Sequence, residues 1–249
     1  MKLNTVIATR KNKTVYRDGK KCIKLFDESY SKADVLNEAL NLARIEQTGI
    51  NVGKLLEVTT IDGKWAIVYE YVAGETLAEK MEKDPAGIPK YIERLVDVQI
   101  SIQKHTCPML NKLKDKMQGK ISQAKLDATT RYELHTRLEG MPTHNKVCHG
   151  DLNPSNVIIT KENKAYIIDW AHVTQGNASA DAARTYLMFC LDGEKEKAEM
   201  YLDLFCKKSD TARQYVQKWM PIVTASQSVK AIKKERDFLL KWVDVVDYE

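Results

Sequence analysis

The sequence predicts an α+β protein with two lobes: a small, β-rich N-terminal lobe over residues 1–72 and a larger, mostly helical C-terminal lobe over residues 73–249. Two Asp-Gly turns, each between β-prone runs, bracket one helical segment in the first lobe. Helical periodicity dominates from Gly74 onward. A short strand pair, VIIT and AYIID, interrupts these helices within residues 157–169. These three observations together indicate the fold class.

The first lobe is predicted from its turns and helix caps. TVYRDGKKCIKLF carries an Asp-Gly pair at 18–19 between two runs rich in β-branched and aromatic residues, and KLLEVTTIDGKWAIVYEYV repeats the pattern at 62–63. Between them lies SKADVLNEALNLARIEQTG, a helix for which Ser31 is the expected N-cap and Gly49 the expected stop. The expected order is strand-turn-strand, helix, strand-turn-strand.

The second lobe is predicted from the spacing of its apolar residues. TLAEKMEK, PKYIERLVDVQISIQKH and two further segments before Gly140 place apolar residues three and four positions apart, as amphipathic helices do. Helices resume at about Asp181 and continue to the end of the chain. The last of them is expected from the helical spacing of Phe238, Leu239, Trp242, Val243 and Val246.

The composition excludes several classes of protein. The 249 residues are 43% hydrophobic and 29% charged, as in an ordinary folded protein, and the formal charge of +5 is spread along the chain, which disfavours nucleic-acid binding. No apolar run approaches the roughly 20 residues of a membrane span, and MKLNTVIATRKNK lacks a signal-peptide core, so a cytoplasmic protein without membrane contact is expected. Five scattered cysteines without a C-x-x-C pair predict buried thiols and indicate neither a disulfide framework nor a zinc site. The oligomeric state is left open.

One segment, VCHGDLNPSNVIITKENKAYIIDW, carries the residues that suggest chemistry. Asp151 lies on a loop, because the Asn-Pro pair that follows excludes a regular helix just before a buried strand. Asn156 stands at the entrance of VIIT and Asp169 ends the partner strand, so a hairpin returns Asp169 to the neighbourhood of Asn156. Such oxygen ligands suit Mg²⁺, and the separate carboxylate could accept or orient a hydroxyl proton. The alternative is a set of ordinary turn residues.

The same segment resembles a known group of enzymes. HGDLNPSN matches the H-G-D-x-x-x-x-N loop of the aminoglycoside phosphotransferase and choline kinase families, and IIDW matches their metal-binding I-D-[WF] segment. These families have the protein-kinase-like fold. The resemblance implies ATP- and Mg-dependent phosphoryl transfer to a hydroxyl group of a small molecule, with Asp151 as catalytic base or positioning carboxylate and Asn156 and Asp169 as metal ligands. GTP in place of ATP is left open.

The resemblance extends over residues 5 to 200 and implies two supporting roles. His149 buttresses the backbone of the loop, and Asp181 holds the loop from beneath. An aspartate near a helix N-terminus is common without such a role.

Four residues of the N-terminal lobe are implicated in nucleotide binding. Lys24 stands in the strand CIKLF, and the resemblance makes it the lysine that binds the α- and β-phosphates. Glu38 borders the apolar side of the predicted helix, where an ion pair with Lys24 is expected. In YEYVAGETL, the resemblance identifies the backbone carbonyl of Glu70 and amide of Val72 as the hinge that meets the adenine edge. An exposed Lys24 and a plain strand-to-helix connection are the alternatives.

The expected phosphate-covering loop departs from the pattern of protein kinases. ATRKNKTV, residues 8–15, contains no glycine, whereas protein kinases have G-x-G-x-x-G there. Arg10, Lys11 and Lys13 either supply the charge that backbone amides supply elsewhere or are solvated turn residues.

The resemblance leaves the acceptor open among sugars, aminoglycosides, amino alcohols and nucleoside-like molecules, because acidic and basic residues are mixed in the C-terminal tail. The alternative function is a nucleotide-binding pseudokinase or regulatory module. The glycine-free loop favours it, whereas the complete set of Asp151, Asn156, Asp169 and Lys24 opposes it. A protein kinase is disfavoured, because H-R-D, D-F-G and A-P-E are absent and an activation segment has no room between Asp169 and Asp181.

Overall fold

A computed structural model describes residues 2–10, 12–229, 231 and 233–243 of the chain. The chain divides into two compact units, and each consists of two segments. The first unit comprises Met1–Lys83 and Pro154–His172, and the second comprises Asp84–Asn153 and Val173–Glu249. The segment with Asn156 and Asp169, expected in the C-terminal lobe, thus packs into the first unit. The division of functions between a nucleotide-binding lobe, 1–72, and a catalytic and substrate-binding lobe, 73–249, stays a prediction.

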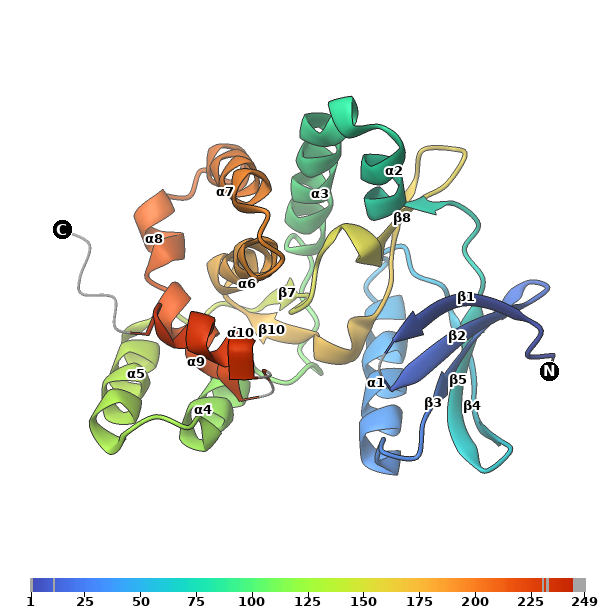
Figure 1. Ribbon diagram of the computed structural model, residues 1–249, viewed down its shortest axis with the longest axis horizontal. Coiled ribbons are helices and arrows are strands. Elements are labelled where there is room, and N and C mark those ends of the chain that lie inside the picture. Colours follow the sequence, from blue (N-terminus) through green and yellow to red (C-terminus); the bar gives the residue numbers. More distant parts are fainter. Residues whose placement is uncertain (1, 11, 230, 232, 244–249) are drawn as a thin grey trace. The chain divides into compact units, whose positions relative to one another are not determined.

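The first unit is built on a five-stranded antiparallel sheet with the strand order β1-β2-β3-β5-β4 (Figure 1). Its middle strand, β3, pairs with β2 on one side and β5 on the other. The strands are β1 (Thr5–Arg10), β2 (Lys13–Asp18), β3 (Lys21–Phe26), β4 (Leu55–Ile61) and β5 (Lys64–Glu70).

The two predicted hairpins are present. β4 and β5 are joined by Asp62 and Gly63, whose φ angles of 49° and 78° are those that a two-residue type I′ turn requires. β2 and β3 are joined by Gly19 and Lys20, with Gly19 at φ 60°, so the turn lies one residue later than the Asp-Gly pair suggested.

The connection between β1 and β2 is equally short. Arg10 pairs with Lys13 across the ladder, and Thr9 pairs with Thr14. The bounds expected for the phosphate-covering loop, residues 8–15, are therefore too wide, because residues 8–10 and 13–15 belong to paired strands. The β-branched residues Thr14 and Val15 favour this extended conformation.

α1 (Lys32–Glu46) packs on one face of the sheet, as Figure 1 shows. Ser31 is its N-cap, because the Ser31 hydroxyl accepts a hydrogen bond from the Asp34 amide at 3.1 Å. The helix ends three residues before Gly49, which adopts φ 83°. Its apolar stripe meets the sheet in a cluster formed by Phe26, Val35, Ala39 and Ile67.

A second, three-stranded sheet with the order β6-β8-β9 completes the first unit. The Asn51 side chain donates to the Ala165 carbonyl at 3.2 Å, and the Asn51 carbonyl accepts from the Ile167 amide at 3.0 Å, which ties β9 to the segment after α1. The elements are β6 (Glu75–Thr76), α2 (Leu77–Lys83), η2 (Pro154–Asn156), β8 (Val157–Ile159), β9 (Ala165–Ile167) and η3 (Trp170–His172).

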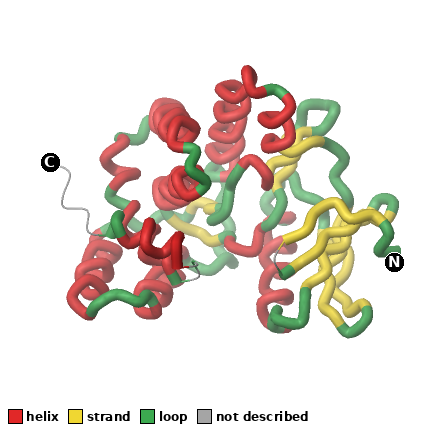
Figure 2. The backbone as a smooth tube through the Cα atoms, in the orientation of Figure 1, coloured by secondary structure: helices red, strands yellow, loops and turns green. Residues whose placement is uncertain are grey.

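The second unit is mostly helical, with one short strand pair, β7 (Lys146–Cys148) and β10 (Thr174–Gly176) (Figure 2). Its central helix, α6, packs on α7, α8 and α9. The helices are η1 (Pro85–Gly87), α3 (Ile88–Ile102), α4 (Leu113–Gln123), α5 (Ala128–Gly140), α6 (Ala178–Leu191), α7 (Lys195–Ser209), α8 (Arg213–Gln217), α9 (Met220–Ser228) and α10 (Lys233–Leu240).

The C-terminal helix is shorter than its apolar spacing predicted. α10 ends at Leu240, so Trp242 and Val243 follow it in a turn, and Val246 lies outside the described residues. Within the described part of the chain, no helix combines the length and apolar character needed to cross a membrane.

Candidate active site

A buried ion pair links the sheet and the helix of the first unit. Lys24 lies on β3, where it is only 4% exposed, and its ammonium group donates to the Glu38 carboxylate of α1. Glu38 comes three residues after Val35, which packs in the core, so the helix turns the carboxylate toward the sheet. A buried charge is costly unless it is paired, and here each of the two residues supplies the other's counter-charge.

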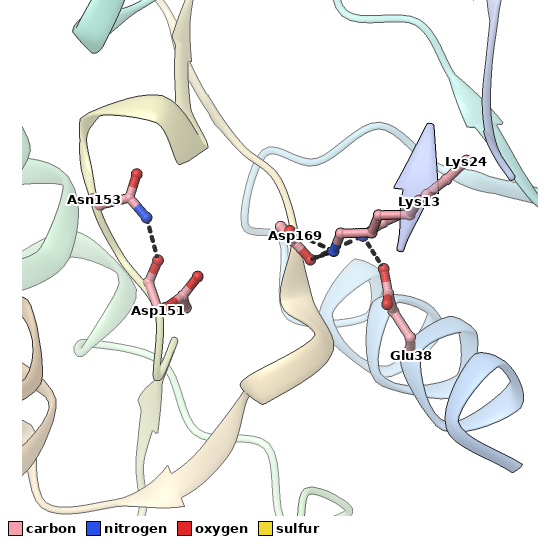
Figure 3. A network of polar contacts seen from close by, with 6 residues as sticks. All are labelled: Lys13, Lys24, Glu38, Asp151, Asn153 and Asp169. Carbon is pink, nitrogen blue, oxygen red and sulfur yellow. Dashed lines mark hydrogen bonds and ion pairs between the residues drawn. The ribbon is translucent and has the colours of Figure 1, made fainter. Parts of the chain in front are cut away.

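Asp169 joins this pair from the segment after β9. Its Oδ1 lies 2.9 Å from the Lys24 Nζ, and its Oδ2 lies 3.0 Å from the Nζ of Lys13, the first residue of β2. Figure 3 shows both lysines reaching toward Asp169, with Glu38 bound to Lys24. Two lysines and two carboxylates thus form one cluster, named here the Lys-Asp cluster, in which the formal charges balance.

The Lys-Asp cluster shifts the pKa values of its members. Burial alone would raise the pKa of Asp169, but the nearby charges of Lys24 and Lys13 outweigh burial and hold this pKa well below its usual range. Burial alone would lower the pKa of Lys24, but the Asp169 and Glu38 carboxylates outweigh it and raise the pKa. The pKa of Lys13 is lowered, first by burial and then by repulsion from Lys24. Asp169 is therefore ionised at neutral pH.

The backbone of Asp169 is unusual for a residue other than glycine. Its φ of 64° lies in the left-handed region, between the end of β9 and the start of η3. Such conformations cost about 1–3 kcal/mol and are concentrated at functional sites, where the surrounding structure maintains them. The turn aims the carboxylate at the two lysines, which a continued strand would not do.

Asn156 lies beside the same segment. It is buried at the end of η2, and its backbone carbonyl accepts a hydrogen bond from the Ile168 amide at 3.0 Å, one residue before Asp169. The hairpin β8-β9 thus brings the two proposed metal ligands into neighbouring positions of the backbone, as the sequence predicted.

Asp169 and Asn156 are the two residues that the resemblance implies as Mg²⁺ ligands. No group of three or more His, Cys, Asp or Glu side chains arranged to hold a metal occurs among the described residues. Mg²⁺ commonly uses one or two protein oxygen ligands and completes its shell with water and phosphate oxygens. Asp169 and Asn156 carry oxygen donors of the kind that Mg²⁺ uses.

At the proposed hinge, the backbone of Glu70 lies close to Gly53, a contact that the sequence did not reveal. Glu70 is the last residue of β5, and Val72 lies in the irregular stretch before β6. The Glu70 amide donates to the Lys54 carbonyl at 2.9 Å. A Cβ atom at Gly53 would collide with the Glu70 carbonyl oxygen, so only glycine fits beside this part of the backbone.

In the second unit, the loop after β7 is fixed by hydrogen bonds from α6 and α3. The amide of Gly150, which has φ 78°, donates to Oδ1 of Asp181 at 2.7 Å. Gln99 donates to Oδ2 of Asp181 at 3.0 Å, and the Thr185 hydroxyl donates to the Leu152 carbonyl at 2.9 Å. Asp181 thus has the supporting position that the resemblance implied.

Asp151 itself is held by three neighbours. Its amide donates to Nδ1 of the fully buried His149 at 3.2 Å. Its carbonyl accepts from the Asn153 side chain at 3.1 Å (Figure 3). Arg184 of α6 binds the carboxylate, with its Nη2 3.1 Å from Oδ1. The second amino group of Arg184, Nη1, is buried without a hydrogen-bond partner among the described residues.

Lys13, Arg184 and Gly53 were not assigned to the site from the sequence. The glycine-free turn pointed to three basic residues without choosing among them. Arg184 comes three residues after Asp181, which places both on one face of α6, but that spacing alone does not distinguish it from a surface arginine. Gly53 gives no sequence signal, because its restriction comes from a tertiary contact.

Comparisons with known proteins agree with this arrangement. The profile of the phosphotransferase enzyme family matches residues 6–217 of the chain. No curated protein matches the sequence significantly.

Solved structures show the same fold at low sequence identity. A thermostable mutant of the aminoglycoside phosphotransferase APH(4)-Ia, in ternary complex with AMP-PNP and hygromycin B, is 12% identical, with a TM-score of 0.72 over 96% of this chain and 91% of the other. The choline kinase LicA from Streptococcus pneumoniae is 16% identical, with a TM-score of 0.63 over 97% and 94%. A choline/ethanolamine kinase family protein from Mesorhizobium loti is 14% identical, with a TM-score of 0.65 over 95% and 87%. The protein-kinase-like fold predicted from the sequence is confirmed.

Proposed function

Because this chain belongs to the phosphotransferase enzyme family and is a small-molecule kinase, we propose that it transfers the γ-phosphoryl group of ATP to a hydroxyl group in a Mg²⁺-dependent reaction. The observation that carries the proposal is the Lys-Asp cluster. A nucleotide triphosphate needs cationic donors for its phosphates and an oxygen ligand for its metal ion, and the cluster offers both within one unit. We propose ATP rather than GTP as the phosphate donor. We also propose that the protein is cytoplasmic, where ATP is abundant.

Each residue of the first unit has a distinct task in this proposal. Lys24, oriented by Glu38, binds the α- and β-phosphates of the nucleotide. Asp169 and Asn156 would hold Mg²⁺, which when bound neutralises charge that develops on the transferred phosphoryl group. The Glu70 carbonyl and Val72 amide bind the adenine edge. Gly53 has no Cβ atom, so the Glu70 carbonyl oxygen can lie directly beside it.

Asp151 acts on the acceptor. Its carboxylate accepts or orients the proton of the attacking hydroxyl, a contribution that general bases make in the transition state. The hydrogen bonds of His149 and Asn153 fix the backbone on either side of this carboxylate, and Arg184 fixes its rotamer. A positioning role for Arg184 follows, because it contacts the reacting carboxylate from α6.

The acceptor is proposed to be a small hydroxyl compound, such as an aminoglycoside, sugar, amino alcohol or nucleoside-like molecule. A cavity of about 500 Å³ lies in the second unit among α6 to α10, within the range of about 300–1,000 Å³ common for small-molecule sites. The rings of Tyr186 and Trp242 meet edge to face beside it at 6.3 Å. Glu199 in its lining is paired with Arg213, and Asp151 is not among the lining residues, so this cavity does not identify the acceptor.

The test is an acceptor panel with a matched variant. The chain is incubated with ATP, MgCl₂ and hydroxylated metabolites or aminoglycosides, and ADP release is measured. Asp151→Asn should lower turnover with the active acceptor by about 10²- to 10⁴-fold, while ATP affinity in calorimetry stays unchanged. Asp115→Asn, an exposed position on α4, should leave both unchanged.

Two outcomes would contradict the proposal. Normal turnover in Asp151→Asn would remove the assignment of the catalytic carboxylate. The second outcome is a chain that binds ATP but releases no ADP with any acceptor. If it also shows no slow Mg²⁺-dependent hydrolysis that Asp169→Ala abolishes, the nucleotide-binding module suggested by the glycine-free turn is favoured.

A further inference from the structure

The segment that joins β1 to β2 has no glycine-rich loop. Residues 8–15 contain no glycine, and Arg10 already pairs with Lys13 across the ladder. An amide that donates across the ladder is not available to an anion, so the paired residues of this hairpin offer fewer donors than an open glycine-rich loop. If this unit binds a triphosphate, another donor must replace those amides.

Lys13 is placed to be that donor. Its side chain is 17% exposed, and its Nζ lies 3.0 Å from Oδ2 of Asp169, 156 residues away in the sequence. This contrasts with Lys21, the first residue of the next strand, which is solvent-exposed. Lys13 therefore belongs to the Lys-Asp cluster, and its ammonium group is not a solvated surface charge.

The position of Lys13 brings a second ammonium group next to that of Lys24. Its ammonium group shares one carboxylate with the ammonium group of Lys24, so two like charges are held close together away from water. Lys13 balances the charge of the second carboxylate in the cluster, and in doing so it leaves two ammonium groups side by side. Two adjacent cations are the arrangement expected around a polyanion.

We propose that Lys13 is a second phosphate-binding residue, whose ammonium group binds the β- or γ-phosphate of the nucleotide in place of the amides of a glycine-rich loop. An ammonium group has three N–H donors, so Lys13 can keep its bond to Asp169 and bind a phosphate oxygen at the same time. The inference rests on the proposed function and adds a residue that the motifs of the sequence did not assign.

The experiment compares nucleotide affinities by calorimetry with excess MgCl₂ and no acceptor, so that no turnover is needed. Lys13→Met should weaken ATP binding by about 10- to 100-fold, as expected for the loss of a charge-assisted hydrogen bond, and leave adenosine binding unchanged. Lys13→Arg should retain most of the ATP affinity. The matched control Lys21→Met, in the same hairpin, should bind both ligands like the original chain.

Other outcomes overturn the inference and separate it from the proposed function. Wild-type ATP affinity in Lys13→Met, with loss of ATP binding in Lys24→Met, would refute the role of Lys13 and leave the proposed function standing. An equal loss of ATP and adenosine binding would show that Lys13 only maintains structure. Absence of ATP binding in the unaltered chain would refute both. If Lys13→Met does not fold, as judged by its melting transition, Lys13→Gln decides between these outcomes, because its amide can still bond to Asp169.

Discussion

The Nζ of Lys24 lies 2.9 Å from Oδ1 of Asp169, although 145 residues separate the two in the sequence. The same ammonium group binds Glu38 of α1, so three segments of the first unit meet at one buried cation. A lysine in this position has two consequences. It neutralises two carboxylates in the folded protein, and it is the cation around which a nucleotide's phosphates can be arranged.

Replacing Lys24 with methionine should therefore affect both stability and binding. Removal of one partner from a buried ion pair leaves an uncompensated charge and typically costs about 3–5 kcal/mol. We expect the free energy of unfolding, measured by urea denaturation at neutral pH, to fall by an amount in that range. ATP affinity should be lost as well.

A double variant separates the two effects. Lys24→Met combined with Glu38→Leu removes both charges of the pair, and an apolar replacement of a buried pair is often close to neutral. Stability should recover largely, whereas ATP affinity should not. If the double variant recovered ATP binding, Lys24 would be a structural cation only.

Much of the first unit could be predicted from the sequence, because its signals are local. The Asp-Gly pair at 62–63 requires positive φ angles that few other residues accept, and the Ser31 cap is read from its own helix. The pairing of Lys24 with Glu38 was also predictable, since a lysine in a buried strand and a glutamate beside an apolar stripe each need a partner.

The rest depends on tertiary contacts that no local pattern encodes. Asp169 was expected as the end of a strand, but it stands two residues beyond β9 with φ 64°, a conformation that its neighbours impose. The loop expected at residues 8–15 was inferred from the place of the phosphate-covering loop between the first two strands of kinases, whereas the strand propensity of Thr14 and Val15 favoured a tight hairpin. Arg184 has no distinguishing sequence signal, because its role comes from the tertiary contact with Asp151.

Arg184 should influence turnover and not nucleotide binding. It holds Oδ1 of Asp151 at 3.1 Å, and a small displacement of a reacting group can cost about 10²-fold in rate. In Arg184→Gln, kcat should fall by about 10- to 100-fold with unchanged ATP affinity. Arg184→Lys should recover part of kcat, because it retains the charge but loses the planar geometry.

The control for this prediction is Arg137→Gln, an exposed arginine on α5, for which kcat should not change. Steady-state kinetics with the active acceptor and calorimetry with ATP are the two measurements. A parallel loss of kcat and ATP affinity in Arg184→Gln would indicate a general disturbance of the second unit and would contradict the positioning role.

The five cysteines should react slowly in the folded chain. All five are free thiols; Cys22, Cys107 and Cys148 are buried as predicted, whereas Cys190 and Cys206 are partly exposed. Burial raises the pKa of Cys148 and, less strongly, that of Cys190, so little thiolate, the reactive form, exists at neutral pH. Titration with a thiol reagent at pH 7 should proceed slowly in buffer and count five thiols in denaturant. Fewer than five in non-reducing denaturant would indicate a disulfide.

Gly53 gives the most specific test of the hinge. A Cβ atom there would collide with the Glu70 carbonyl oxygen, the group proposed to lie at the adenine edge, and its backbone would have to shift. Gly53→Ala should therefore weaken adenosine and ATP binding to a similar degree, whereas loss of a phosphate contact weakens ATP binding alone. Gly119→Ala in α4 is the matched control, because a Cβ atom there meets open space and alanine stabilises a helix by up to about 1 kcal/mol relative to glycine. Unchanged adenosine affinity in a folded Gly53→Ala chain would place the adenine elsewhere and remove Glu70 and Val72 from the proposed site.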